Sequence, residues 1–526
     1  MKGSDSAMRS ATTIRALFAS VILLTLAACA EETGGMGARA PADPAQPPGG
    51  APVPGAPAGE PGEPAGPEEA DPATPFGRSV VYISSENGGA DQKLYAVDVN
   101  GTNLVELSAN PARAGKVISV ALSPDGRWAA YVAEHDKNRV LDLYVTNRDG
   151  SVRRKLSSGI KRDSTVRSVN WSPNSSQLAY LVSSSDFKKK DELWVSSVDG
   201  SASQRIVPGV VDVFPSGSGF SWSATSRYLG LSLKMIGGNR YFTVATTGSP
   251  SAVSVGSGSF GSTSWGAWSS SGDRFAYVST MFGGRPILSS YDAATGERRD
   301  LVNDLSLLDR IFALRWSPND QAIASFTFKS LQNQAEIFVA PAGGGGNVQV
   351  SKQSAQGLSS VRNFKWSPDS SSLIAFAKDA GLDQLLLARA DGSSSVHPLA
   401  DIGPDIKTAS ATYSPNGQSL AFIDGRSPGS LYLSDGGGFG NRRTLLTADR
   451  LYRTLFWTRD GSGLLYEAGL EEGEPRIVHF MSSDGQENRV VSTNLTGGNE
   501  VLCMAVMPTG IASDQQNDCK LFSELD

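Results

Sequence analysis

The stretch Trp171–Val182, which reads WSPNSSQLAYLV, decides how this chain folds. An aromatic residue and a serine lead into a turn in which Pro173 fixes φ at the first corner and Asn174 suits the second. The run 177–182 that follows is rich in branched and aromatic residues and predicts a strand. The signature returns along the chain, so one short turn and the strand after it are used many times.

Eight copies of the signature lie at a nearly constant spacing. They begin at Leu122, Trp171, Trp222, Trp268, Trp316, Trp366, Tyr413 and Trp457, with steps of 49, 51, 46, 48, 50, 47 and 44 residues. We assign a structural role to Pro124, Asp125, Trp171, Pro173, Trp222, Trp268, Trp316, Pro318, Trp366, Pro368, Pro415 and Trp457. Such a period indicates repeated units that bury their apolar faces only against their neighbours. We expect the tryptophans to pack between these units rather than to form a ligand platform.

Each repeat contains four predicted strands. In the second copy they are 169–172, 177–182, 192–198 and 204–207, with a hairpin turn at Asp199-Gly200 before the last. The inner strands are almost continuously apolar, which is typical of strands covered on both faces. A four-stranded sheet of about 48 residues that stacks radially on its neighbours is a propeller blade.

These motifs resemble the TolB-type β-propeller repeat, with its aromatic-Ser-Pro-Asp-Gly turn, Leu-Ala-Phe/Tyr strand, Leu-Tyr-Val strand and Asp-Gly hairpin. The resemblance covers about residues 79–510. It implies the fold, and it says little about function because the matching residues are structural. The separate α/β domain that TolB-like proteins carry before the propeller has no counterpart in this sequence, so the resemblance does not imply membership of a Tol system.

The ends of the repeat region predict an all-β ring that closes on itself. Residues 79–84, 93–98 and 104–107 match the second, third and fourth strands of a blade that lacks its first strand. The segment 501–510 resembles the missing first strand, and joining the two would remove the free edges of the ring. We expect a single propeller of eight or nine blades over residues 77–526, with two smaller propellers as the alternative.

The first 28 residues predict a lipoprotein signal peptide. Three basic residues precede the apolar stretch 16–28, which is too short for a stable transmembrane helix. Leu26-Ala27-Ala28-Cys29 resembles a bacterial lipobox, which implies acylation of Cys29 and cleavage before it. The alternative is an ordinary signal peptide with a chance cysteine. Ala30 follows Cys29 where retention in the inner membrane would favour Asp, so the resemblance favours the outer membrane.

Residues 29–76 predict the lipidated cysteine and a disordered tether. Twelve of the chain's 28 prolines lie in 34–76, among Gly, Ala and Glu. Such a segment cannot bury apolar area and stays extended. We therefore expect a propeller that stands off the membrane of the cell envelope while staying attached to it.

Charge and cysteine content limit the partners. The formal net charge is −6, and removal of the signal segment makes it −8, which disfavours nucleic acid. The run 188–190 of lysines is interpreted as a solvated hairpin tip. Cys503 and Cys519 could pair in an oxidising compartment and clamp the closing strand, although two free thiols are the alternative. We expect a monomer.

The sequence offers little catalytic chemistry. His135, His397 and His479 lie in different repeats, without metal-ligand spacing, and only His135 has polar neighbours. No nucleophile elbow, phosphate loop or calcium loop is present, so no catalytic residue, metal or cofactor is predicted. Paired carboxylates could still act across a propeller face, and the acidic loop candidates are Asp186, Asp191, Asp304 and Asp309.

Two functions remain. The first is a non-catalytic propeller that binds an envelope protein, such as a peptidoglycan-linked lipoprotein; the apolar tip 281–284 would suit such contacts. The second is a hydrolase or lyase that acts on polysaccharide through two carboxylates about 5 to 9 Å apart. A structural spacer without a specific partner is a weaker third possibility.

Overall fold

A computed structural model of the chain describes residues 76–506 and 519–520, apart from a series of short interruptions of which 207–218 is the longest. The signal peptide, Cys29 and the tether lie outside the described residues. So do the lysine run 188–190, Asp186 and residues 281–283 of the apolar tip. The described residues belong to the second of two compact units, which begins at Ala70.

The strands of the first three blades follow the expected repeat. Blade 1 contains β1 (Ser79–Glu86), β2 (Asp91–Asp98), β3 (Val105–Glu106) and β36 (Glu500–Val506). Blade 2 contains β4 (Val117–Leu122), β5 (Ala129–Ala133), β6 (Asp142–Thr146), β7 (Arg153–Lys155) and β37 (Cys519–Lys520). Blade 3 contains β8 (Ser164–Trp171), β9 (Gln177–Ser184), β10 (Glu192–Ser197) and β11 (Ser203–Ile206).

The next three blades are each built from four consecutive strands. Blade 4 contains β12 (Gly219–Trp222), β13 (Tyr228–Met235), β14 (Gly238–Ala245) and β15 (Ala252–Ser257). Blade 5 contains β16 (Ala267–Trp268), β17 (Arg274–Thr280), β18 (Pro286–Asp292) and β19 (Arg298–Val302). Blade 6 contains β20 (Arg310–Trp316), β21 (Ala322–Lys329), β22 (Gln334–Pro341) and β23 (Val348–Gln349).

The last three blades complete the ring. Blade 7 contains β24 (Leu358–Trp366), β25 (Ser372–Asp379), β26 (Leu382–Arg389) and β27 (His397–Asp401). Blade 8 contains β28 (Ser410–Tyr413), β29 (Ser419–Ile423), β30 (Gly429–Asp435) and β31 (Arg443–Ala448). Blade 9 contains β32 (Arg450–Trp457), β33 (Gly463–Gly469), β34 (Ile477–Ser482) and β35 (Asn488–Val490).

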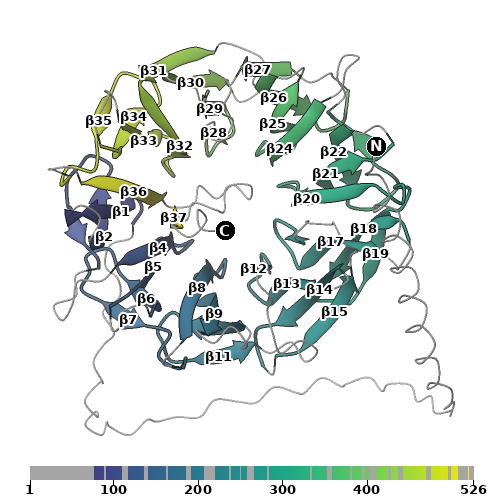
Figure 1. Ribbon diagram of the computed structural model, residues 1–526, viewed down its shortest axis with the longest axis horizontal. Helices are drawn as coiled ribbons and strands as arrows, with labels where there is room; N and C mark the ends of the chain where they lie inside the picture. The colour runs from purple at the N-terminus through teal and green to yellow at the C-terminus, as the bar shows by residue number, and fades with distance from the viewer. Residues whose placement is uncertain are drawn as a thin grey trace, which may run out of the picture. The chain divides into compact units, whose positions relative to one another are not determined.

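The nine sheets fan around one centre, so the prediction of a single propeller is confirmed and the blade count is nine (Figure 1). Neighbouring strands in each blade are antiparallel, and the strand that carries the first part of the repeat lies on the inner side: β36 in blade 1, and β4, β8, β12, β16, β20, β24, β28 and β32 in the others. The inner strands of blades 2 to 9 therefore begin at the same end of the ring and run into the turn of the repeat signature at the other. We call these ends the upstream rim and the downstream rim.

The ring closes as the sequence predicts. Strand β36, from the end of the repeat region, pairs with β1 from its beginning, with Val80 opposite Val506 and Ser85 opposite Glu500. This pairing covers the edge that β1 would otherwise expose. The short strand β37 is an addition that the sequence analysis did not predict, and it pairs with the inner edge of β4.

Apolar cores fill the spaces between blades rather than one central core. One cluster joins Leu193 and Val195 of blade 3 to Leu229 and Phe242 of blade 4. Another joins Ala421 of blade 8 to the inner blade-9 residues around Trp457. Since each blade is covered on both faces, no blade can bury its apolar surface alone. Among the described residues, no helix is long and apolar enough to cross a membrane.

Candidate functional site

The repeated tryptophans connect each blade to the one before it. The indole N–H of each donates to an inner-strand carbonyl of the preceding blade at 3.0 to 3.2 Å. The pairs are Trp171 with Ala121, Trp222 with Asn170, Trp268 with Ser221, Trp316 with Ala267, Trp366 with Arg315, and Trp457 with Thr412. These side chains therefore set the register between blades, and their indole nitrogens already have a partner.

The complete turns form a second set of links along the downstream rim. In blade 3, Ser172 Oγ donates to Asn174 Oδ1 at 2.7 Å and accepts from Gln177 N at 2.9 Å. The backbone N–H of Asn174 then donates to Ser226 Oγ of the next blade. Ser226 has a φ of 62°, a strained value for serine that this contact offsets.

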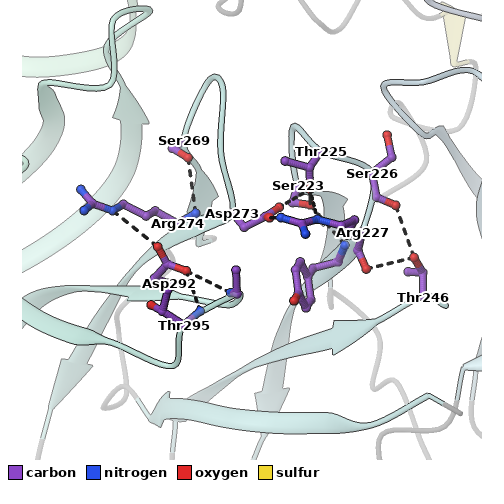
Figure 2. A network of polar contacts seen from close by, with 12 residues as sticks. Ser223, Thr225, Ser226, Arg227, Thr246, Ser269, Asp273, Arg274, Asp292 and Thr295 are labelled. Carbon is purple, nitrogen blue, oxygen red and sulfur yellow. Dashed lines mark hydrogen bonds and ion pairs between the residues drawn. The ribbon is translucent and has the colours of Figure 1, made fainter. Parts of the chain in front are cut away.

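Two turns lack the proline and the Asx residue, and the next blade supplies carboxylates in their place, of which Figure 2 shows the one at the blade-4 turn. In blade 4, Thr225 donates to Asp273 of blade 5, which also forms an ion pair with Arg227. In blade 5, the backbone N–H groups of Ser270 and Ser271 both donate to Asp320 of blade 6. The recurrent acidic residues of this rim are thus engaged in holding turns.

The titration of the turn carboxylates agrees with that structural role. The pKa of Asp149 lies below its ordinary value because its carboxylate accepts hydrogen bonds from the side chain and backbone of Ser151. Burial alone would raise the pKa of Asp369, but hydrogen bonds from Ser367 and Ser371 outweigh it and lower the pKa. A general acid would need the opposite shift, toward neutrality.

Those histidines and loop carboxylates whose side chains are described do not gather into one site. His135, which the sequence placed in a polar loop cluster, is 3% exposed and packs edge-on against Tyr131 and Tyr144. His479 is 1% exposed and stacks on Tyr466. The side chain of His397 lies outside the described set. Asp191 lies directly before β10 of blade 3, and Asp304 lies exposed on the link between blades 5 and 6.

Asp309 is a structural residue that fastens two exposed loops together. It is 1% exposed, and its carboxylate accepts from the backbone N–H groups of Ser306 and Ser330, each at 2.9 Å. Lys329 Nζ lies 3.4 Å from Asp309 Oδ2, the oxygen that accepts from Ser306 N. One of the joined loops leads into β20 and the other connects β21 to β22, so both lie at the upstream rim of blade 6.

These two loops present a patch of leucines, which we call the leucine patch. Leu307 is 51% exposed, Leu308 is 61% exposed and Leu331 is 83% exposed. Such exposure is uncommon for three large apolar side chains on loops that a buried carboxylate holds together. Exposed apolar side chains that lie in a cluster mark interaction sites. Sequence analysis looked for apolar tips at 281–284 and missed this patch, because the bond network around Asp309 is not visible in sequence.

The inner strands are strongly basic. Across the nine inner strands the chain carries seven basic residues and one acidic residue, Glu500, although the whole chain has a net charge of −6. The basic residues are Arg167, Arg310, Arg315, Arg362, Lys365, Arg450 and Arg453. The inner strands thus carry a net positive charge in a chain that is acidic as a whole.

The basic residues differ in what they contact. Arg310 donates to the carbonyls of Leu307 and Asp309, and Lys365 Nζ donates to the carbonyl of Ala411 in the next blade. Arg167 and Arg450 are exposed, and neither makes a hydrogen bond or an ion pair with another described residue. These two arginines are therefore the described inner-strand cations best placed to meet a ligand.

A bulge recurs on the inner strands at one level. The pairing register shifts around Ile118 in β4, Arg167 in β8, Phe312 in β20 and Arg362 in β24. Each of these residues lies four positions before the first residue of its motif. The extra residue of a bulge leaves the alternation of the strand, and bulges often re-aim a side chain at a functional site. The regular spacing to the motif is a signal that could have located this level from sequence.

The cysteines of the closing region lie on neighbouring strands. Cys503 is disulfide-bonded and belongs to β36, the inner strand of blade 1. Cys519 belongs to β37, which pairs with β4 so that Cys519 lies opposite Val120. The side chain of Cys519 is outside the described set, and its pairing with Cys503 stays a prediction.

Other features of the described residues contribute less. No group of three or more His, Cys, Asp or Glu side chains in the described ranges could hold a metal ion. A shallow pocket at the seam between blades 9 and 1 is lined by Trp457, Arg78 and Asp460, and Arg78 donates to Asp460 at 2.8 Å across it. That ion pair links the two blades where the ring closes.

Together these features define a nine-bladed β-propeller with an exposed leucine patch and a cationic centre. No family model and no curated protein sequence matches the chain. Among solved structures it is similar to one described as the crystal structure of the eukaryotic initiation factor, with a TM-score of 0.54 and 12% identity over 81% of this chain and 97% of that one. This likeness shows the propeller fold alone.

A second solved structure comes from an analysis of two prolyl endopeptidases. Its TM-score is 0.42 and its identity 11%, over 70% of this chain and 55% of that one. The likeness is too distant to add to the first.

Proposed function

We propose that this chain is a lipid-anchored protein of the cell envelope whose propeller binds a protein partner without catalysis. The resemblance of Leu26-Ala27-Ala28-Cys29 to a lipobox supports the anchor, and the proline-rich segment 34–76 supports a tether. The TolB-like repeat supports placement in the envelope. The outer membrane is the favoured membrane by the same resemblance.

The leucine patch is the observation that carries the binding function. Leu307, Leu308 and Leu331 are more than half exposed on loops that Asp309 holds in place. Anchors that are already ordered lose little conformational entropy when a partner covers them, so they suit a protein interface. Arg310 donates to the carbonyls of Leu307 and Asp309 beside the patch and adds positive charge to the same rim.

The polysaccharide-cleaving alternative has less support. It needs two carboxylates that face each other, about 5 to 9 Å apart. Of the loop candidates, Asp309 is buried in its own hydrogen bonds, and on the described inner strands Glu500 is the single acidic residue. Nothing in the described part of the chain favours this alternative over partner binding.

Crosslinking in native envelopes followed by mass spectrometry tests the binding function. We expect the wild-type chain to crosslink to a specific protein through residues near the leucine patch. The double variant Leu308→Ser and Leu331→Ser should lose at least nine-tenths of that product. The control is Val490→Ser, because Val490 is 40% exposed but lies on the outer strand β35. Equal crosslinking in all three proteins would contradict the proposal.

The anchor has its own test. Cys29→Ala should move the protein from the membrane fraction to the soluble fraction, since acyl chains contribute about 0.8 kcal/mol per buried CH₂. Retention of the variant in membranes would contradict lipidation at Cys29. The leucine variants should remain in the membrane fraction, so the two parts of the proposal can fail separately.

A further inference from the structure

A fully buried carboxylate lies at the seam where the ring closes. Glu467 of β33 is 0% exposed. Leu465, two residues earlier and therefore on the same face of the strand, belongs to the apolar cluster that joins blade 9 to Val501 and Met504 of the closing strand β36. The side chain of Glu467 thus lies in the interface between blades 9 and 1, among apolar residues.

The hydrogen bonds of this carboxylate are unevenly shared between its two oxygens. Oε2 accepts from Arg476 Nε at 2.7 Å and also from Arg476 Nη2. Oε1 is buried and makes no hydrogen bond with a residue that the structure describes. An ionised carboxylate is costly to bury unless donors satisfy both oxygens. The geometry therefore favours the neutral acid over the carboxylate.

Arg476 connects the carboxylate to the closing strand. Its backbone carbonyl accepts from Val501 N at 2.7 Å, so it holds the first part of β36 against blade 9. Its guanidinium lies 4.7 Å from the centre of the Tyr452 ring, and its Nη2 lies 3.5 Å from Thr454 Oγ1, both on the inner strand β32. The charge of Glu467 therefore acts on a residue that fastens β36.

Arg476 is the single charged side chain that contacts the Glu467 carboxylate among the described residues. The other ionisable groups described on the surrounding strands have different surroundings. His479 stacks on Tyr466 on the opposite face of the blade, the hydroxyl of Tyr82 donates to Asn494, and Arg450 and Glu500 are exposed at the first positions of β32 and β36.

The titration of Glu467 follows from these surroundings. Burial raises the pKa of Glu467 above its ordinary value, and Arg476, Thr454 and the backbone of Met504 offset only part of that rise. Because the pKa is higher in the folded protein than in the unfolded chain, the folded ring binds this proton more tightly. The stabilisation from the proton is complete below the unfolded value near 4.5 and is lost as the pH rises through the folded pKa.

We propose that Glu467 and Arg476 form a proton-operated latch on the closing strand of the ring. The neutral acid leaves the seam closed, whereas the carboxylate leaves a buried charge with one unsatisfied oxygen beside β36 and lets that strand open more often. Ring closure is therefore tighter in acid than at neutral pH. This regulation goes beyond the proposed binding function, since the leucine patch lies on blade 6 and needs no change at the seam.

Hydrogen exchange of the full chain, followed by mass spectrometry, measures the opening of β36 through the amides of residues 501–506. The variant Glu467→Gln keeps the shape of the side chain but cannot ionise. We expect it to slow the exchange of these amides at least fivefold at pH 8 and to exchange like the wild type at pH 4. Comparison of two proteins at one pH cancels the intrinsic pH dependence of exchange and the titration of other carboxylates.

Glu336→Gln is the matched control. Glu336 is also a buried carboxylate, 4% exposed, and burial raises its pKa, but it lies on β22 of blade 6, where it accepts from Ser351. The exchange of the β36 amides should not change in this variant at either pH. Slower exchange in the control as well would assign the effect to the stability of the whole ring and overturn the latch.

Arg476→Gln tests the cation of the latch. The variant keeps the backbone carbonyl that accepts from Val501 but removes the charge that faces Glu467. We expect the β36 amides to exchange at least tenfold faster at pH 8, where the carboxylate loses its counter-charge. The change should be smaller at pH 4, where the acid is neutral. An equal change at both pH values would mean that Arg476 acts only by packing, and it would contradict the latch.

Two results with Glu467→Gln overturn the inference. Faster exchange of β36 at pH 8 would mean that the ion pair fastens the strand instead of loosening it. Exchange equal to that of the wild type at pH 8 would mean that the charge of Glu467 does not act on the seam. Neither result affects crosslinking through the leucine patch, so the latch and the proposed function are tested separately.

Discussion

The turns of blades 3 and 5 perform the same task with different residues. In blade 3 the turn supplies its own partners: Ser172 Oγ accepts from Gln177 N at 2.9 Å and donates to Asn174. In blade 5 the corresponding bond from Arg274 N to Ser269 Oγ lengthens to 3.4 Å, and Asp320 of the next blade accepts from the turn instead. A repeat can therefore lose its signature where a neighbour replaces the missing hydrogen bonds.

The same comparison applies to blade 4. Its turn has alanine at the proline position, and Thr225 donates to Asp273 across the blade boundary (Figure 2). Asp273 is 6% exposed, whereas the Asx residues of complete turns lie near the surface. Asp273 is thus a more buried acceptor than those Asx residues, and the substitute bonds of both incomplete turns bridge two blades. Their loss should cost more than the loss of a bond within one turn, because a buried group left without a partner is costly.

The largest expected effect comes from Asp320. Asp320→Ala removes the acceptor of Ser270 N, Ser271 N and Ser271 Oγ and places alanine at a φ of 57°. We expect the free energy of unfolding to fall by about 3 kcal/mol, against about 1 kcal/mol for Asn174→Ala in blade 3. Urea denaturation of the two variants measures both. Equal losses would mean that the carboxylate bridging two blades matters no more than a local turn bond.

A second pair of variants places proline in each of the two incomplete turns, and we expect the two changes in the free energy of unfolding to have opposite signs. Ser270→Pro restores the motif residue but removes an N–H that donates to Asp320, so we expect a loss of about 2 kcal/mol. Ala224→Pro restores it in blade 4, where no hydrogen bond from that N–H is described, and should add about 0.5 kcal/mol by restricting the unfolded chain. Thermal unfolding followed by circular dichroism gives the order. Stabilisation by both prolines would contradict the role of Asp320.

The smallest expected effect is a pH dependence of the free energy of unfolding, which turns with aspartate should show and turns with asparagine should not. Burial alone would raise the pKa of Asp369, but its hydrogen bonds lower it below the unfolded value near 4. The stabilisation from its charge is complete above about pH 4 and is lost as the pH falls through the lowered folded pKa. Asp369→Asn should cost about 0.5 kcal/mol at pH 7, after allowance for solvent screening, and less at pH 3.

Matched unfolding curves at the two pH values measure the effect of Asp369→Asn. The variant Asn416→Ser in blade 8 provides the control. Neither asparagine nor serine titrates in this pH range, so the cost of that exchange should not depend on pH in this way. A cost for Asp369→Asn that grows toward pH 3 would contradict the hydrogen-bond account of its pKa.

Much of the fold could be predicted because the information is local and repeated. Pro173 and Asn174 encode a turn, and the apolar run after them encodes a strand, so eight copies indicate eight similar blades. The ninth blade could be predicted from its incomplete strand set at 79–107 and the unmatched strand near 501–506. Closure then follows from the cost of leaving two sheet edges exposed.

The residues of the candidate site were harder to predict from the sequence than the fold was. His135 looked polar from its neighbours in the chain, yet it is buried against Tyr131 and Tyr144, because strands β5 and β6 of its own blade bring both rings against it. Asp309 looked like a possible catalytic carboxylate, but it accepts hydrogen bonds from its own loop and from a second loop, 3 and 21 positions away in sequence. The leucine patch depends on that same contact.

The chain by itself determined the repeat, the turns, the strand order and the closing partner, because each depends on residues within one repeat or on the two matching ends. Only the tertiary structure decided which arginines share the centre of the ring, which loops expose leucines and which carboxylates serve the neighbouring blade. The carboxylate links join residues about fifty positions apart that meet when blades stack, and the leucine loops meet through a contact 21 positions apart in sequence between Ser330 and Asp309, so backbone preference within a repeat cannot encode either.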